Sequence, residues 1–94
     1  MTFEVLVEVR LRPGIADPQG ATVERALPAL GFEGVGAVRV GKAIRLRVDA
    51  PDAATARARA VAVADRLLAN PVIEVSEVSV LDGASPPEPN GSPP

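Results

Sequence analysis

The segment from Gly36 to Lys42 has the spacing GxxxxGK, which in a phosphate-binding loop provides backbone donors and a lysine for a nucleotide. Such a loop also needs Ser or Thr after the lysine to reach Mg²⁺, and it leads into a helix. Here Ala43 follows Lys42, and the alternating pattern of a strand continues beyond it. The context therefore argues against nucleotide binding at this motif.

Carboxylates are the next groups that could do acid–base chemistry. Those near the ends or faces of predicted elements are Glu4, Glu8, Asp17, Glu74 and Glu77. None lies in an evidently apolar surrounding, and solvated strand faces together with a helix cap explain all five more simply. The sequence therefore predicts no catalytic residue.

The side-chain inventory narrows the chemistry further, because the 94 residues include no His, Cys, Trp or Tyr. Without His or Cys there is no Ser-His or Cys-His nucleophile, no zinc site of the usual ligands, no haem attachment and no disulfide framework. We expect this chain to bind no metal and no cofactor.

The charge pattern makes nucleic acid a poor partner, since 12 acidic residues face 10 basic ones and only two residues are aromatic. One local basic cluster falls within nine positions: Arg39, Lys42, Arg45 and Arg47. In a strand pair these side chains would share one surface, and we interpret them as a solvated sheet face.

No targeting or membrane signal is evident. Glu4 and Glu8 interrupt the apolar start, so it does not resemble a signal peptide, and no apolar run approaches the roughly 20 residues that a membrane-spanning helix needs. The sequence predicts a cytoplasmic protein.

The first element that must position these groups is a strand. Apolar and polar residues alternate from Phe3 to Leu11, as in a half-buried strand. Leu6 interrupts the polar face, which indicates that part of this face is covered, for example by another subunit. Arg12-Pro13-Gly14 then signals a turn.

A short helix is predicted next. Asp17 is placed to cap its exposed N–H groups, and Pro18 suits the first helical position. Apolar residues recur at three- and four-residue spacing at Val23, Ala26, Leu27 and Leu30. Pro28 predicts a kinked or 3₁₀ last turn, and Gly31 stands where a left-handed stop would lie.

Two strands joined by a hairpin follow. Val38 and Val40 indicate the first, and the second alternates Ile44, Leu46 and Val48 with Arg45, Arg47 and Asp49. Gly41-Lys42 is the predicted corner.

Pro51-Asp52 opens the longest helix, from about Ala53 to Ala69, and Asn70-Pro71 ends it. Its predicted apolar stripe is Ala53, Ala56, Ala60, Val63, Ala64 and Leu67. The small side chains would let this helix approach its sheet closely.

The last strand, from Val72 to Leu81, changes phase: Ile73 and Val75 are odd-numbered, whereas Val78 and Val80 are even. Either a bulge near Ser76-Glu77 restores the register, or the two halves of the strand bury opposite faces against different partners.

The resulting order is strand, helix, strand, strand, helix, strand, which predicts an α+β, two-layer, ferredoxin-like domain over residues 1–81. Both helices would cover one face of a four-stranded antiparallel sheet, and the other face would be bare unless a second copy covered it. Residues 82–94 hold five of the chain's 10 prolines and few apolar residues, so we expect a disordered tail.

Three segments carry a resemblance to a known family. They are Asp17-Pro18-Gln19-Gly20, Val38-Arg39-Val40-Gly41-Lys42, and Leu67-Leu68-Ala69-Asn70-Pro71-Val72-Ile73-Glu74. In this order and at about this spacing they resemble the PurS family, the small subunits of a three-part phosphoribosylformylglycinamidine (FGAM) synthase. Pro28, the Ala-rich second helix and the proline-rich tail depart from the family pattern.

The resemblance implies a non-catalytic role in purine biosynthesis. It implies that the chain bridges the glutaminase PurQ, which releases ammonia, and the synthetase PurL, which consumes it, while ATP, Mg²⁺ and glutamine are used by those subunits. It also implies self-association, as a dimer or tetramer, through the sheet. Candidate contact residues are Arg39, Lys42 and Asn70, each of which also has a simpler structural explanation.

One alternative remains open on the same element order. Small-molecule-sensing modules of the ACT type often bind an amino acid between dimerised sheets, and such a ligand would meet Gly-containing loops such as Arg12 to Asp17. Fold alone does not decide between these functions.

Overall fold

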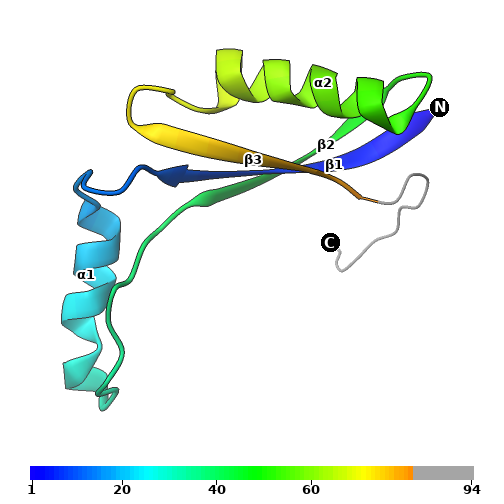
Figure 1. The fold of residues 1–94 in the computed structure, drawn as a ribbon. Coiled ribbons are helices and arrows are strands. Elements are labelled where there is room, and N and C mark those ends of the chain that lie inside the picture. Colours follow the sequence, from blue (N-terminus) through cyan, green and yellow to red (C-terminus); the bar gives the residue numbers. More distant parts are fainter. Residues whose placement is uncertain (82–94) are drawn as a thin grey trace.

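The computed structural model describes residues 1–81, and the predicted tail lies outside the described residues. Its regular elements are, in order, β1 (Thr2–Leu11), α1 (Pro18–Ala26), β2 (Lys42–Asp49), α2 (Ala53–Val63) and β3 (Glu74–Val80). The three strands form one antiparallel sheet in the order β2-β1-β3, and α2 lies across one face of it (Figure 1). The α+β class is confirmed.

The core lies between α2 and the central strand β1. The alternation predicted for β1 is confirmed, because Phe3, Val5, Val7 and Val9 are all buried. From α2 and the turn after it, Ala56, Ala60 and Ala64 are fully buried, and their four-residue spacing places them on one face. Three small side chains thus allow the helix to lie close to the valines of β1.

The rest of the predicted stripe on α2 is exposed, namely Ala53, Val63 and Leu67. A π-helical turn, Ala64–Leu68, follows α2, and the N–H of Ala69 donates to the carbonyl of Ala64, five residues back. This wider turn changes the phase of the helix, so Leu67 points away from the sheet and is 78% exposed.

The predicted fourth strand at Val38 and Val40 is not present among residues 1–81, where the sheet has three strands. The backbone of residues 32–41 runs alongside α1 instead of along a strand edge (Figure 1). Gly41-Lys42 is therefore not a hairpin corner: β2 begins at Lys42, opposite Val9 of β1.

The prediction that both helices cover one sheet face is also wrong for α1. Figure 1 shows α1 projecting from the end of the sheet, far from α2. Only Gly20 of α1 is buried, and Val23 in its apolar stripe is 45% exposed. Neither α2 nor the sheet covers this stripe in the described chain (Figure 1).

The phase change in the last strand is accommodated without a bulge. The pairs between β1 and β3 follow one another without interruption from Val5↔Val80 to Leu11↔Glu74. Val78 and Val80 therefore share the core face, whereas Val75 lies on the opposite face with Leu6. The two halves of the strand therefore face opposite sides of the sheet, and no bulge restores the register.

Candidate functional site

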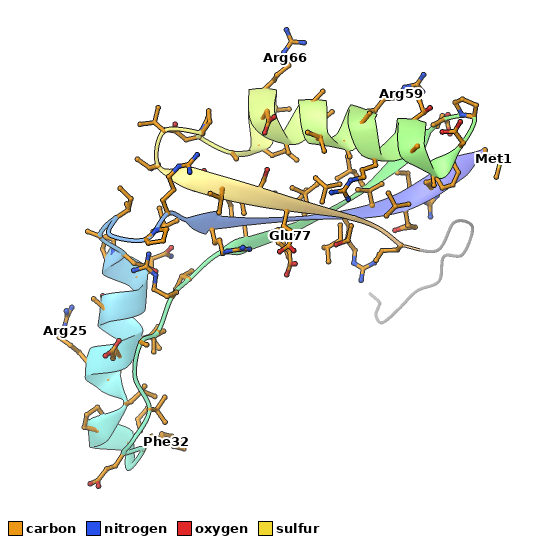
Figure 2. The ribbon with its side chains drawn as sticks, in the orientation of Figure 1. Met1, Arg25, Phe32, Arg59, Arg66 and Glu77 are labelled. Atoms are coloured by element: carbon orange, nitrogen blue, oxygen red, sulfur yellow. The ribbon has the colours of Figure 1, made fainter. Side chains whose placement is uncertain are left out.

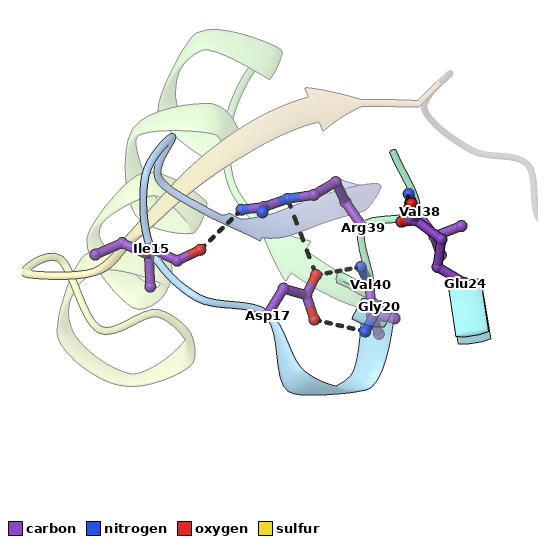
Figure 3. Close-up of polar contacts among 7 residues, drawn as sticks. All are labelled: Ile15, Asp17, Gly20, Glu24, Val38, Arg39 and Val40. Carbon is purple, nitrogen blue, oxygen red and sulfur yellow. Dashed lines mark hydrogen bonds and ion pairs between the residues drawn. The ribbon is translucent and has the colours of Figure 1, made fainter. Parts of the chain in front are cut away.

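The first candidate site is the arm, defined as residues 17–40, and its base on the sheet. Asp17 is the central group at this base (Figure 3). One of its carboxylate oxygens accepts from the N–H of Gly20 at 2.8 Å, and the other accepts from the N–H of Val40 at 2.8 Å. Asp17 thus caps α1, as predicted, and also holds the returning chain.

Glu24 makes a second contact of the same kind farther along α1. Its carboxylate accepts from the N–H of Val38 at 3.1 Å. Gly20 lies between the two carboxylates, where a Cβ atom would stand 2.3 Å from the carbonyl oxygen of Val38. Glycine is therefore required at this position because the returning backbone passes directly against the helix.

Arg39 completes the base of the arm. Its guanidinium donates to the carbonyl of Ile15 at 3.3 Å and lies 3.9 Å from the carboxylate of Asp17, whose side chain is 7% exposed. The hydrogen bonds from Gly20 and Val40 lower the pKa of Asp17, and the charge of Arg39 lowers it further, against the opposing effect of burial.

Lys42 and Gly41 hold the start of β2. The Lys42 ammonium donates to the carbonyl of Leu68 at 3.3 Å. Leu68 ends the π-helical turn Ala64–Leu68, called here the α2 extension, and a cation is favoured at such a C-terminal end. A Cβ on Gly41 would lie 2.8 Å from the carbonyl oxygen of Val9, so this residue permits a close approach of two backbones.

Asn70 organises the turn that enters β3. Its side-chain oxygen accepts from the N–H of Val72, and its own N–H donates to the carboxylate of Glu74 at 2.7 Å. Arg12 fastens the same turn to the end of β1 by donating twice to the carbonyl of Pro71. Arg39, Lys42 and Asn70 each therefore have a structural contact, and their role toward partners stays a prediction.

Two residues of this base escaped the sequence analysis. The sequence patterns assign no role to Glu24, and they place Arg12 only in a turn. No spacing signal marked either one, because their partners, Val38 and Pro71, are 14 and 59 residues away in the chain.

An open cavity of about 560 Å³ lies between the base of the arm and the ends of the strands. Its charged lining includes Asp17, Lys42 and Glu74, and its apolar lining includes Val9 and Ile73. Arg10 also lines the cavity and pairs with Glu77, whereas Asp17, Lys42 and Glu74 bond to backbone atoms of this chain. They serve to position the arm and the β3 turn.

The second candidate surface is the bare sheet face, the side opposite α2. Glu4 there pairs with Arg47 at 3.3 Å and Arg45 at 3.9 Å, and Arg10 pairs with Glu77 at 3.3 Å. These exposed pairs contribute little to stability, about 0–1 kcal/mol each. Half-buried Leu6 lies among them.

The expected basic cluster is not one surface. Arg45 and Arg47 lie on the bare sheet face, whereas Arg39 belongs to the arm and Lys42 reaches the end of the α2 extension. The GxxxxGK segment leads into β2, and no helix follows Lys42, which agrees with the argument against a nucleotide loop. Among residues 1–81, no group of three acidic residues is arranged to hold a metal ion.

Comparison with known proteins decides the family. A family model described as "PurS: Phosphoribosylformylglycinamidine (FGAM) synthase" matches residues 4–82. The chain belongs to the PurS family. The resemblance based on the three segments is thereby confirmed, and membership favours a synthase subunit over a ligand-sensing module of the ACT type.

Relatives from distant organisms support the family. The phosphoribosylformylglycinamidine synthase subunit PurS of Synechocystis is 43% identical over 92% of this chain and 88% of its own length. In the structure of PurLQS from Thermotoga maritima, one chain matches with a TM-score of 0.79 at 34% identity, over 86% of this chain and 99% of that one.

A further PurS family structure, from Methanocaldococcus jannaschii, matches with a TM-score of 0.75 at 32% identity, over 83% of this chain and 94% of that one. It is described as a subunit of formylglycinamide ribonucleotide amidotransferase in the purine biosynthetic pathway. Neither helix within residues 1–81 has the length and apolar character needed to cross a membrane.

Proposed function

We propose that this chain is a non-catalytic subunit of FGAM synthase in purine biosynthesis, which holds PurL and PurQ together and helps to confine ammonia between them. The match to the PurS family over residues 4–82 carries the proposal. ATP, Mg²⁺ and glutamine are then used by the partner subunits in the cytoplasm, and no cofactor binds to this chain.

The contacts within the chain support a role in assembly. Around the open cavity, Asp17, Lys42 and Glu74 bond to the backbone of this chain and Arg10 pairs with Glu77, so these charged groups fix local structure. The surfaces that remain for partners are the arm and the bare sheet face. A subunit that acts through surfaces fits this distribution better than one that acts through a pocket.

Reconstitution tests this role. Glutamine-dependent FGAM synthesis by PurL and PurQ should require this chain, whereas a high concentration of ammonia should drive PurL without PurQ or this chain. The second assay is the control for intact PurL. If PurL and PurQ use glutamine equally well without this chain, the bridging role is wrong.

Self-association is the second part of the proposal, and the arm supports it. Its exposed apolar side chains are Val23, Leu30, Phe32 and Val35, at 45–69% exposure. Figure 2 shows Phe32 near the far end of the arm, distant from α2. About half or more of each of these side chains except Val23 is exposed, and apolar surface of this kind on a projecting element is typical of a protein interface.

The sheet offers a complementary surface for the arm. On the α2 side of β2, Ile44 and Leu46 are only half-buried, although their partners in β1, Val7 and Val5, are fully buried. The surface formed by Ile44 and Leu46 is where the first predicted helix, α1, was expected to pack. We propose that the α1 of a second copy covers it, so that two chains exchange arms and associate through their sheets.

Charged substitutions on the arm test this arrangement. Leu30→Asp and Phe32→Asp should each convert the oligomer to a monomer in sedimentation velocity, because a buried carboxylate without a partner is strongly unfavourable. Val72→Asp is the matched control, since Val72 is 78% exposed and lies outside the arm. If both arm variants still associate and Leu6→Asp does not, the bare sheet face is the interface instead.

A further inference from the structure

The arm has two legs, α1 and the returning residues 38–40, that run side by side away from the sheet (Figure 1). In a β-ladder or a helix, two such segments would be joined by bonds between backbone N–H and C=O groups. Among residues 1–81, no backbone–backbone bond connects α1 with residues 38–40. Their connection is made by the side chains of Asp17 and Glu24.

The spacing of these residues explains how the connection forms. Asp17, Gly20 and Glu24 are three and four residues apart, which places them along one face of α1, from its cap toward its last turn. The carboxylates of Asp17 and Glu24 accept from the N–H groups of Val40 and Val38. These are alternate residues, so their N–H groups lie on one side of an extended chain. The carboxylates thus stand where a neighbouring strand would offer carbonyl oxygens.

We propose that Asp17 and Glu24 form a carboxylate clasp that holds the arm as one preformed unit, with its shape set before any partner docks. The clasp takes the place of the missing fourth strand: it satisfies the N–H groups of Val38 and Val40 and fixes the path of the returning leg. Gly20 provides the close approach that both bonds need.

A preformed arm changes the energetics of association. Ordering a flexible segment during binding opposes the interaction, and a rigid segment avoids most of that cost. This consequence depends on the proposed exchange of arms, whereas the clasp itself does not. A clasp also explains why apolar side chains such as Leu30 and Phe32 stay presented to solvent instead of collapsing onto the sheet.

Asp17 and Glu24 differ in a way that makes the clasp testable. Asp17 uses both oxygens, one for Gly20 and one for Val40, whereas Glu24 bonds to Val38 through one. Asn has a single acceptor oxygen and cannot replace Asp17, but Gln can replace Glu24. Asp52 caps α2 through the N–H of Thr55, so Asp52→Asn should keep its contact and is the matched control for the cap.

Amide hydrogen exchange on the full chain measures the clasp. Exchange at Val40 should accelerate at least about tenfold in Asp17→Asn, and exchange at Val38 should do so in Glu24→Ala. Glu24→Gln and Asp52→Asn should leave both amides as in the wild type. The amide of Val7 in the central strand reports whether each variant is folded, and Glu24→Ala, at an exposed position, keeps the test informative if Asp17→Asn unfolds.

Measurement at two protein concentrations separates the clasp from the oligomer. Protection of Val38 and Val40 that is the same at both concentrations, and is lost in the two disrupting variants, supports the clasp even if sedimentation shows no exchange of arms. Protection that rises with concentration and survives Asp17→Asn and Glu24→Ala would mean that a second copy orders the arm, and the clasp would be wrong.

Discussion

Within residues 1–81, the helices α1 and α2 start alike and lie in different surroundings. Asp17 and Asp52 each cap a helix by accepting from the N–H of the residue three positions later. Yet α2 buries Ala56 and Ala60 against the sheet, whereas α1 buries only Gly20, against its own returning leg. A cap decides where a helix begins, and the residues on its face decide whether it packs on a sheet.

The side chains explain the difference. The alanines on α2 allow the helix backbone to come close to the valines of β1, and dense contacts follow from that. On α1, Val23 is larger than alanine and exposed, and the first turn is occupied by the contacts of Asp17 and Gly20 with the returning leg. The helix that packs is held by its core, and the helix that projects is held by the hydrogen bonds of Asp17 and Glu24 to its returning leg.

The largest effect is expected where α2 meets the sheet. Ala60→Leu inserts a larger side chain at a fully buried position and should lower the free energy of unfolding by about 1–3 kcal/mol. Ala58→Leu on the exposed side of the same helix should change it by less than about 0.5 kcal/mol. Urea unfolding measures both. Equal effects in the two variants would show that α2 does not pack by this face.

A change of pH should separate the two caps. The pKa values of Asp17 and Asp52 are both lowered from 3.8, chiefly by hydrogen bonds from the backbone. A lowered pKa in the folded state means that each carboxylate stabilises the fold above about pH 4 and that this stabilisation is lost as pH falls through the lowered pKa.

Protonation of Asp17 should therefore release Val40 while α2 stays packed by its alanines. Lys42 and Glu74 line the same cavity, and Arg39 faces the carboxylate directly. On acidification, we expect the NMR signal of the Val40 amide to shift before signals of the central strand change. Asp17→Asn should remove that early step. If core and arm signals change together in the wild type, the arm is not an independent unit.

The same comparison shows what the sequence could reveal. The alternation in β1, the cap at Asp17 and the start of α2 at Asp52 are local patterns, and each was interpreted correctly because its physical cause lies within a few residues. The stripe on α2 was interpreted correctly for Ala56, Ala60 and Ala64 but wrongly for Ala53, Val63 and Leu67, which are exposed. The packing of α1 and the strand at Val38 and Val40 were predicted wrongly, since both depend on contacts over longer distances. An alternating valine pair indicates an extended backbone but does not show which acceptor its N–H groups will meet.

The candidate site follows the same rule. Asp17 could be identified as a cap from its type and place in the chain, whereas Gly41 was predicted as a hairpin corner and Gly20 only as part of a family motif. The close backbone approaches at both glycines appear only in the structure. Glu24 could not be identified, because its role exists only once residue 38 has come back beside the helix. Whether Arg39, Lys42 and Asn70 also contact PurL or PurQ is a property of a complex, and a single chain's sequence holds no pattern that would report it.

The smallest effect concerns the path of the returning leg. Ala37 has a φ of +54°, a left-handed conformation that costs a residue with a Cβ roughly 1–2 kcal/mol. Ala37→Gly removes this strain but adds flexibility to the unfolded chain, so the net gain in stability should be less than about 1 kcal/mol. It should appear as slower amide exchange at Val38, the next residue.

Ala29→Gly provides the control, because Ala29 lies in the 3₁₀ turn Pro28–Leu30, where a negative φ suits alanine. There the same substitution should only add flexibility and accelerate exchange in the arm. Slower exchange in Ala37→Gly together with faster exchange in Ala29→Gly would show that residue 37 holds its left-handed turn in solution. The clasp requires this turn to bring Val38 against Glu24. If exchange changes in the same direction in both variants, the returning leg takes another path, and α1 is then the only fixed part of the arm.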